Sequence, residues 1–271
     1  MTRLALSSAL ALLAFFALPL ASYANDTVTF KDPKGDDNGP GKYIYPTKGD
    51  YQKGDFDLTQ VKITDKGSNV EFRITVRNRL RDVWNSRSWG GNGFSVQFAQ
   101  VYIKTGKGGH SQALPGMNVQ FAKGHRWNKV VLISPQSTTR LKSEINLKAR
   151  KFKQDIAIPT STSASGKTMI AIVPKSALGG FSTAWGFQVL LQSNEGYPTK
   201  TDLLTRPVNE YNGEHRFGGG NDGNCDPHVI DMLAGKGHGN DGEKAEQHKQ
   251  LSSFSCEGNG KLAIIHMVYA K

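Results

Sequence analysis

The stretch Val70-Glu71-Phe72-Arg73-Ile74-Thr75-Val76-Arg77 decides the fold, because its apolar residues alternate strictly with polar ones. This period of two is typical of a strand with one buried face. Val61 and Ile63 precede it, and the polar segment Asp65-Lys66-Gly67-Ser68-Asn69 between them predicts a hairpin connection. These two strands and the polar segment between them are therefore expected to form an antiparallel β-hairpin.

Further short strands are predicted along the rest of the chain. A second alternating run of Phe94, Val96 and Phe98 changes phase before Val101 and Ile103, which is typical of a bulge or a bend. Other apolar runs cover residues 129–134, 167–173, 186–192 and 261–268. Helical periodicity is weak, with short pieces expected near residues 174–178, 228–233 and 243–251. Eight or more short strands separated by Gly, Pro, Asn and Asp predict an all-β sandwich in a single domain, with long Gly-rich loops and a few short helices.

Composition excludes several classes of protein. A chain of 271 residues can bury a large core without metals or disulfides. Its two cysteines exclude a small disulfide scaffold and a zinc finger or ribbon. No apolar run beyond the N-terminal segment reaches eighteen residues, which argues against a polytopic membrane protein.

The N-terminal segment predicts export. Arg3 precedes an almost uninterrupted apolar run over residues 4–20, and Ser22-Tyr23-Ala24 provides the small residues of a cleavage site. We expect residues 1–24 to be a cleaved signal peptide and residues 25–271 to be the mature periplasmic or extracellular protein, with an uncleaved anchor as the alternative. In an oxidising compartment, Cys225 and Cys256 are expected to form a disulfide, with two free thiols as the alternative.

The chain carries a formal net charge of +11, of which the signal peptide contributes only Arg3. This excess favours anionic partners such as cell-wall polymers or acidic polysaccharides, although it can also serve solubility alone. No basic block is interleaved with aromatic residues, and export also argues against a nucleic-acid partner.

Five segments carry a resemblance to a known family. They are FKDPKGDDNGPGKYIYPT (Phe30–Thr47), GDFDLTQVKI (Gly54–Ile63), VYIKTGKGGHSQALPGMN (Val101–Asn118), Trp127 leading into VVLISP, and FGGGNDGNCDPHVIDML (Phe217–Leu233). In this order they resemble the C-terminal domain of glucodextranase, a DOMON-like β-sandwich related to family-nine carbohydrate-binding modules. The resemblance spans residues 27–233 and is expected to reach the C-terminus, and it implies an immunoglobulin-like or DOMON-like sandwich that serves as an accessory binding domain. The cysteine pair and the loop over residues 236–248 look like additions to the family pattern.

The loop from Asp32 to Gly41 is a candidate calcium site. Asp32, Asp36 and Asp37 place three carboxylates within six positions, and Asp57 is a plausible fourth ligand. Calcium takes six to eight oxygen ligands in flexible geometry, which an Asp- and Gly-rich loop supplies. The alternative is turn chemistry, in which Asp and Asn side chains cap tight turns. A second acidic segment with Asp222, Asp226 and Asp231 is expected to form a turn and the start of a helix, with a separate metal site as the alternative.

Aromatic side chains are the candidates for carbohydrate binding, because sugar rings stack on flat aromatic faces. Trp84 and Trp89 lie in a polar, Gly-rich loop over residues 83–93, so they are expected to be the more exposed. Trp127, Tyr43 and Tyr45 are further candidates, with burial in the core as the alternative for each.

Catalytic signatures such as GxSxG, HExxH, GxGxxG and a Walker loop are absent from the sequence. The leading hypothesis is therefore an exported, calcium-stabilised, non-catalytic domain that binds a polysaccharide or a cell-envelope glycan. One alternative is a periplasmic redox module with b-type haem. The absence of CxxCH excludes covalent c-type haem, and no sequence feature selects a ligand pair for b-type haem, which argues against this alternative. The candidate haem ligands are Met117, His110, His228, His266 and Met267. The other alternative is a structural envelope protein that assembles through exposed strand edges.

Overall fold

The predicted hairpin is present as β2 (Leu58–Lys66) and β3 (Asn69–Val76). The structure is a computed structural model, and it describes residues 25–222, 225–258 and 260–270, so the predicted signal peptide lies outside the described residues. Asp65 pairs with Val70 and Ile63 with Phe72, so the apolar side chains of both strands share one face. Strict alternation and a tight polar turn are thus enough to set the register here.

Two sheets form the sandwich. The first has the antiparallel order β1 (Thr27–Lys31), β2, β3, β9 (Thr168–Pro174), β8 (Ser161–Ser165). The second has the order β11 (Asp231–Met232), β10 (Gly186–Ser193), β4 (Gln97–Lys104), β6 (Lys129–Ile133), β7 (Ile156–Ala157), and β13 (Val268–Tyr269) also pairs with β10. The all-β sandwich with a few short helices is confirmed.

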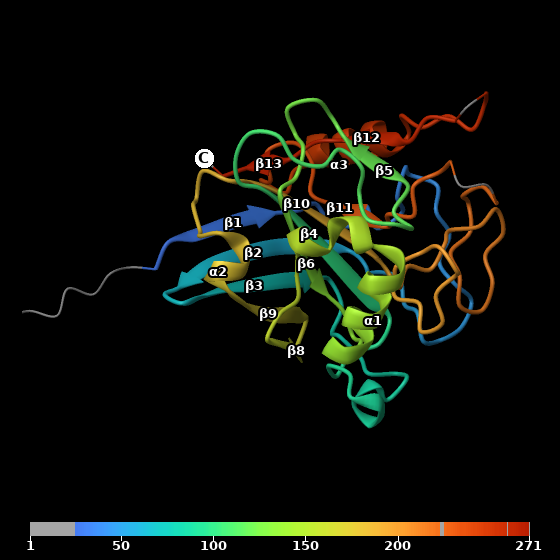
Figure 1. Cartoon of the computed structure of the whole chain (residues 1–271). Helices are drawn as coiled ribbons and strands as arrows, with labels where there is room; N and C mark the ends of the chain where they lie inside the picture. Colours follow the sequence, from blue (N-terminus) through green and yellow to red (C-terminus); the bar gives the residue numbers. More distant parts are fainter. Residues whose placement is uncertain (1–24, 223–224, 259, 271) are drawn as a thin grey trace, which may run out of the picture.

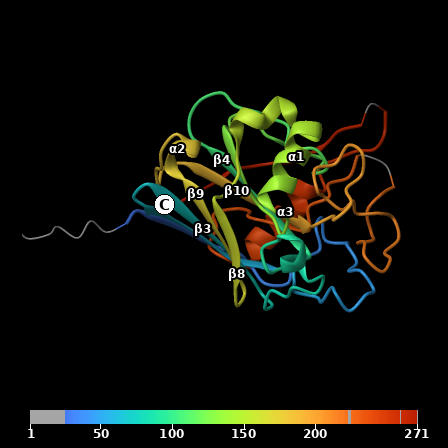
Figure 2. The ribbon, with the colours of Figure 1, turned by 60° about the horizontal axis from the view of Figure 1, so that its bottom comes forward.

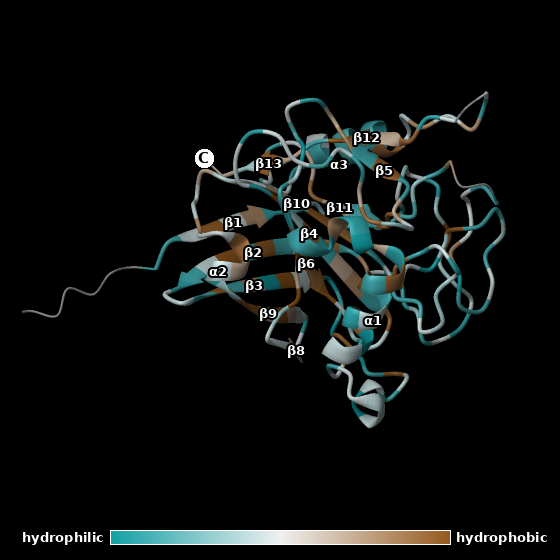
Figure 3. Cartoon of the chain, viewed as in Figure 1, coloured by the Kyte–Doolittle hydropathy of each residue, from teal (hydrophilic) through white to brown (hydrophobic). Residues whose placement is uncertain are grey.

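A main core fills the space between the two sheets. Phe72 and Ile74 of the first sheet pack there with Val101 and Val189 of the second, and all four are fully buried. Figure 3 shows apolar residues concentrated in the strands and polar residues in most connecting loops.

A further layer covers the outer face of the second sheet. Phe98, Tyr102 and Leu190 form a second core beneath this layer. The layer contains β5 (Val119–Phe121), α1 (Thr138–Lys148), the 3₁₀ helix η2 (Arg150–Asp155), α3 (Asp241–Leu251) and β12 (Ala263–Ile265). Figure 2 shows β4 and β10 between the first sheet and α1. The central strands of the second sheet are therefore buried on both faces.

Because β4 is buried on both faces, the apolar residues before and within it do not follow a single alternating pattern. Val96 faces the main core, and a bend at Val96 precedes β4, after which Ala99, Val101 and Ile103 face the same core. The predicted phase change thus marks the start of a strand that pairs with β10 without a register shift. The helix expected over residues 228–233 is wrong, since this segment contains β11.

Long loops gather at one end of the sandwich. Figure 1 shows the connection from β1 to β2 beside the connection from β10 to β11 at this end, and a backbone bridge joins Ile44 of the former to Gly218 of the latter. The predicted disulfide is confirmed: Cys225 and Cys256 are bonded, with Cα atoms 5.1 Å apart, and they tie the β10–β11 connection to the segment after α3. Among the described residues, no helix has the length and apolarity needed to span a membrane.

Candidate functional site

Three buried carboxylates meet where β1, β2 and β11 end or begin. Asp32 follows β1, Asp36 lies four residues further along the loop, and Asp231 opens β11. One oxygen from each carboxylate lies within 4.8 Å of the others. We call these three residues the Asp32 cluster, and Asp57, which immediately precedes β2, is a fourth buried carboxylate beside it.

Backbone groups and α3 hold the Asp32 cluster in place. Asp231 accepts hydrogen bonds from the backbone N–H of Leu58 at 2.7 Å and of Met232 at 2.8 Å. The Asp36 carbonyl oxygen accepts from Gln247 Nε2 of α3 at 2.7 Å. The cluster therefore joins the β1–β2 loop, β11 and α3.

Burial and mutual repulsion destabilise the ionised forms of these carboxylates. Burial, and then the charge of Asp57, raises the pKa of Asp36 to about 7. Burial, and then the charge of Asp37, raises the pKa of Asp57 to about 6. Burial also raises the pKa of Asp32 and Asp231 well above the usual range, with neighbouring carboxylates adding to the effect. Such a group of buried acids needs protons or a cation to offset its charge.

Three carboxylate oxygens at this position have no hydrogen-bond partner among the described residues. They are Oδ2 of Asp32, Oδ1 of Asp36 and Oδ1 of Asp57. Buried polar atoms are nearly always paired in native proteins, so three unpaired acceptors together offer positions for protons, ordered water or a cation. Carboxylate oxygens are the ligands that calcium prefers.

The structure brings together only part of the predicted calcium set. Asp32 and Asp36 are in the cluster, and Asp57 lies beside it. The Asp37 carboxylate instead accepts from the Gly54 backbone N–H at 2.9 Å and from the Tyr45 hydroxyl, so it fastens a turn. Asp231 was missed as a partner, because nearly two hundred residues separate it from Asp32 in the sequence.

An open pocket of about 540 Å³ lies among the loops at this same end of the sandwich. We call it the Trp89 pocket, and it is lined by Trp84, Trp89, Gln136, Ser137, Arg140, Glu195, Gly196, Tyr197, Arg206 and His215. Its size falls within the range of small-ligand sites in proteins.

Three aromatic side chains give the Trp89 pocket its apolar surface. Trp84 is anchored by a 2.8 Å hydrogen bond from Nε1 to the Asp50 carboxylate and packs edge-on against His215. Trp89 belongs to the 3₁₀ helix η1 (Ser86–Trp89) and is 40% exposed, and Tyr197 is 91% exposed. Exposed aromatic faces around a hollow are costly to hydrate and therefore favour a ligand with flat apolar faces.

Paired charges provide the polar part of the same pocket. The Arg206 guanidinium contacts both oxygens of Glu195, at 3.1 and 3.2 Å. Glu195 also accepts from the Tyr197 backbone N–H at 3.1 Å, which holds the turn that carries the tyrosine. Arg140 of α1 bonds to Glu144 at 2.9 Å. These groups offer donors and acceptors in fixed directions beside the aromatic rings.

The other aromatic candidates lie elsewhere. Trp127 is completely buried, and its Nε1 donates to the Gln112 carbonyl at 3.0 Å. Tyr43 is 6% exposed and donates its hydroxyl to the Pro227 carbonyl. Tyr45 is half-buried and bonded to Asp37. None of the three lines the Trp89 pocket, whereas Tyr197 does. The Gly196-Tyr197-Pro198 sequence, a turn signal, could have indicated that this tyrosine is exposed.

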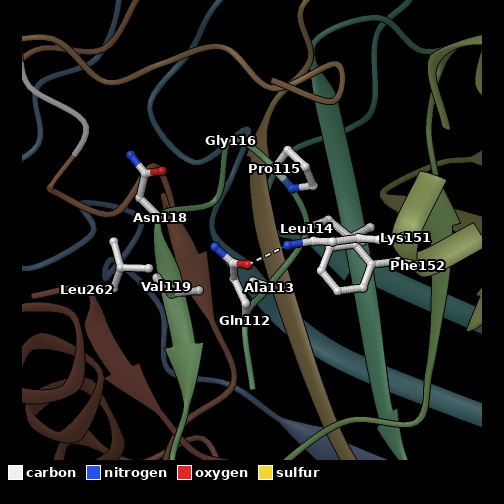
Figure 4. A pocket seen from close by; sticks show the side chains of 10 residues that line it. All are labelled: Gln112, Ala113, Leu114, Pro115, Gly116, Asn118, Val119, Lys151, Phe152 and Leu262. Atoms are coloured by element: carbon white, nitrogen blue, oxygen red, sulfur yellow. Dashed lines mark hydrogen bonds between the residues drawn. The ribbon is translucent and has the colours of Figure 1, made fainter. Parts of the chain in front are cut away.

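Two other hollows differ from the Trp89 pocket in chemistry. The cavity in Figure 4 has a volume of about 120 Å³, and its lining includes Gln112 and Lys151, which share a 2.8 Å hydrogen bond. A larger hollow of about 600 Å³ beside α3 is lined by His125 and His266 but by no Trp, Tyr or Phe.

The candidate haem ligands have other contacts. Met117 and His228 are buried, and the His228 ring nitrogens lie 2.9 Å from the Gly116 carbonyl and 3.5 Å from the Asn118 amide. His110 Nε2 is 2.8 Å from Asp155. His266 and Met267 lie between β12 and β13.

Comparison with protein families decides the relationship. A family model described as the C-terminal binding module, SLH-like, of glucodextranase matches residues 27–268. The chain belongs to this family. The resemblance seen in the sequence motifs is confirmed, and the match extends past residue 233 to include the disulfide and α3. The family is one of binding modules rather than catalytic domains. Comparison with curated proteins finds no match.

Proposed function

We propose that this protein is an exported, non-catalytic module that binds carbohydrate in the Trp89 pocket and is stabilised by calcium at the Asp32 cluster. The observation that carries the binding part is the convergence of Trp84, Trp89 and Tyr197 on one open pocket. Membership of a family of binding modules supports it.

The chemistry of the pocket suits a sugar. A pyranose ring has an apolar face that stacks on an indole or a phenol, and hydroxyl groups at its edge that need both donors and acceptors. The Arg206–Glu195 pair presents a guanidinium and a carboxylate side by side, so it can donate to one hydroxyl and accept from a neighbouring one. Because the Trp84 indole is already fixed by its hydrogen bond to Asp50, this side chain loses little entropy on binding.

Calcium fits the residues of the Asp32 cluster. The orphaned oxygens of Asp32, Asp36 and Asp57, together with Asp231, form a buried set of carboxylates that a divalent cation would neutralise. Bound calcium would tie the β1–β2 loop to β11. The proposed ligand set therefore differs from the sequence prediction in one residue, because Asp231 replaces Asp37.

Export rests on the N-terminal sequence and on the disulfide between Cys225 and Cys256, which suits an oxidising compartment. Intact-mass analysis of protein purified from the producing cells should give a chain beginning at Asn25. A chain beginning at Met1 would remove the cleaved signal peptide from the proposal.

Affinity electrophoresis tests the binding site. The protein is run through gels that contain a panel of neutral and acidic polysaccharides, with calcium present. We expect selective retardation by one polymer, loss of that retardation in Trp89→Ala, and partial retention in Trp89→Phe, which keeps an aromatic face. Equal retardation of wild type and Trp89→Ala would show that the carbohydrate does not bind in the Trp89 pocket. If no polymer retards the protein, the proposal that it binds carbohydrate is wrong.

Thermal melting tests the cation site. We expect EDTA to lower the melting temperature by about 5 °C or more and calcium to restore it, since a ligand at about 100 times its Kd adds about 2.7 kcal/mol. Asp36→Asn should abolish this response, whereas Asp37→Asn, one residue away but outside the cluster, should retain it. A melt that is insensitive to EDTA would leave the turn interpretation in place.

A further inference from the structure

We infer that an exposed basic ridge on α1 and η2 is a second contact surface and that its partner is an anionic polysaccharide. The α1–η2 ridge consists of Lys142, Arg150, Lys151 and Lys153, all of which are exposed. It uses none of the residues of the Trp89 pocket or the Asp32 cluster, so it stands apart from the proposed function.

The ridge carries charge that the protein does not neutralise. Between residues 138 and 155 there are six basic and two acidic side chains. Both acids are already engaged: Glu144 by Arg140 at 2.9 Å and Lys148 at 3.0 Å, and Asp155 by Lys129 at 2.9 Å and His110 at 2.8 Å. The four ridge cations have no ion-pair partner among the described residues.

Packing beneath η2 fixes the display of these cations. Phe152 is 4% exposed and points into the second core, so its neighbours Arg150, Lys151 and Lys153 are directed outward. The Lys151 ammonium lies 4.7 Å from the centre of the Phe152 ring and donates to Gln112 Oε1 at 2.8 Å, which Figure 4 shows. A preordered cation loses less entropy when it meets an anion.

The distribution of the ridge cations favours a polymer over a single small anion. Lys142 and Lys153 line one hollow of about 330 Å³, whose other side chains include Ile156 and Ile158. Lys151 lines different hollows together with Gln112. None of these hollows, which are formed by described residues, is lined by all four ridge cations. Individually exposed charges contribute little, but a chain with repeated anionic groups can contact cations that lie in separate hollows.

A polysaccharide suits the ridge better than a lipid surface. A helix that lies on a membrane presents a broad apolar face to it. The exposed residues of α1 are mostly polar, and Leu147, 74% exposed, is its one large exposed hydrophobic side chain. The ridge therefore offers charge without an apolar anchor.

A matched pair of charge variants tests this inference. The ridge variant replaces all four ridge cations with glutamine. The control variant replaces Lys62, Lys66, Lys107 and Lys123, four exposed lysines outside the ridge and without ion-pair partners among the described residues, so both lose the same net charge. Binding to fluorescent polygalacturonate and dextran sulfate is measured by anisotropy at 50 mM and 500 mM NaCl, with melting temperature as the check on folding.

We expect the ridge variant to bind at least about tenfold more weakly at 50 mM NaCl, the control less than threefold more weakly, and the difference to disappear at 500 mM. Equal losses in the two variants, or no binding of wild type to either polymer, would overturn the inference. Ridge-dependent binding to phosphatidylglycerol vesicles without ridge-dependent binding to the polysaccharides would overturn the assigned partner. Because the ridge variant keeps Trp89, its retardation by a neutral polysaccharide reports the proposed function separately.

Discussion

The Asp32 cluster and the Trp89 pocket are built from loops at the same end of the sandwich, yet they invert the usual placement of side chains. The cluster buries carboxylates that water would solvate well, and the pocket exposes aromatic rings that a core would bury well. Gln97 Nε2, at the start of β4, donates to the Asp55 carbonyl. This hydrogen bond joins the β1–β2 loop, which carries Asp32 and Asp36, to the strand that follows the tryptophan loop. Under the proposed function, these loops serve two purposes: the buried carboxylates stabilise the fold once they are neutralised, and the exposed rings contact the ligand.

The largest expected effect breaks the support of the cluster. Asp231→Ala should lower the free energy of unfolding by about 2 to 3 kcal/mol in EDTA, because the buried N–H of Leu58 loses its acceptor, whereas the N–H of Met232 keeps Gln247 Oε1 at 2.9 Å. Urea denaturation measures this change. A loss below about 1 kcal/mol would mean that the Asp231 carboxylate is dispensable to the fold. The Asp32 cluster would then contribute as little to stability as the Trp89 pocket.

The pH dependence of stability tests whether the carboxylates of the Asp32 cluster and Asp57 are protonated in the folded protein. The pKa of Asp36 is raised to about 7 and that of Asp57 to about 6 in the folded protein, whereas an unfolded Asp has a pKa near 3.9. The folded state therefore holds protons that the unfolded chain releases. The stability from these protons is complete below pH 3.9 and is lost as pH rises through 6 and 7.

Urea denaturation in EDTA at pH 5, 6, 7 and 8 should show this loss, by about 2 to 4 kcal/mol. Asp36→Asn should flatten the profile, and the difference between the two proteins isolates the carboxylate from buried His228, whose lowered pKa acts in the opposite direction. Calcium should reduce the decline, because it pairs with the deprotonated carboxylates. Parallel profiles for wild type and Asp36→Asn would contradict the assigned origin of the effect.

A smaller effect tests the pocket with a residue that the sequence did not single out. Tyr197→Ala should weaken binding to the retained polysaccharide about tenfold, or about 1.4 kcal/mol, through loss of one stacking face. Tyr211→Ala is the matched control, since Tyr211 is 71% exposed but does not line the pocket. Equal affinities for the two variants would place the sugar elsewhere.

The smallest expected effect is on stability at the pocket. Trp89→Ala should change the free energy of unfolding by less than about 1 kcal/mol, because this indole is 40% exposed. Guanidinium denaturation beside Asp231→Ala makes the comparison direct. A loss of 2 kcal/mol or more would make Trp89 part of the core.

The sequence predicted the elements whose burial has a simple period. β2 and β3 alternate because only one face of their sheet is buried, and the tight turn between them sets the register. α1 was missed, since its inward face combines Leu141 and Ile145 with Glu144, a buried acid neutralised by Arg140 and Lys148. No apolar pattern can reveal a helix whose buried face includes an ion pair.

The candidate site was predictable only where its residues are neighbours in the chain. The acidic loop and the tryptophan loop each stand out by composition, so Asp32, Asp36, Trp84 and Trp89 could be selected. Their remaining partners are brought in by the fold, from β11 and from the loop after β10. Local patterns do not encode such long-range contacts, and Trp127 shows the converse, because a tryptophan beside a strand can fill the core completely.

One measurement tests the division of roles most directly. Wild type, Trp89→Ala and Asp36→Asn are run side by side through a gel that contains the retained polysaccharide, at a temperature at which all three are folded. The account predicts equal retardation of wild type and Asp36→Asn, and free migration of Trp89→Ala. Retardation of Trp89→Ala together with free migration of Asp36→Asn would contradict it and would place the carbohydrate at the acidic cluster.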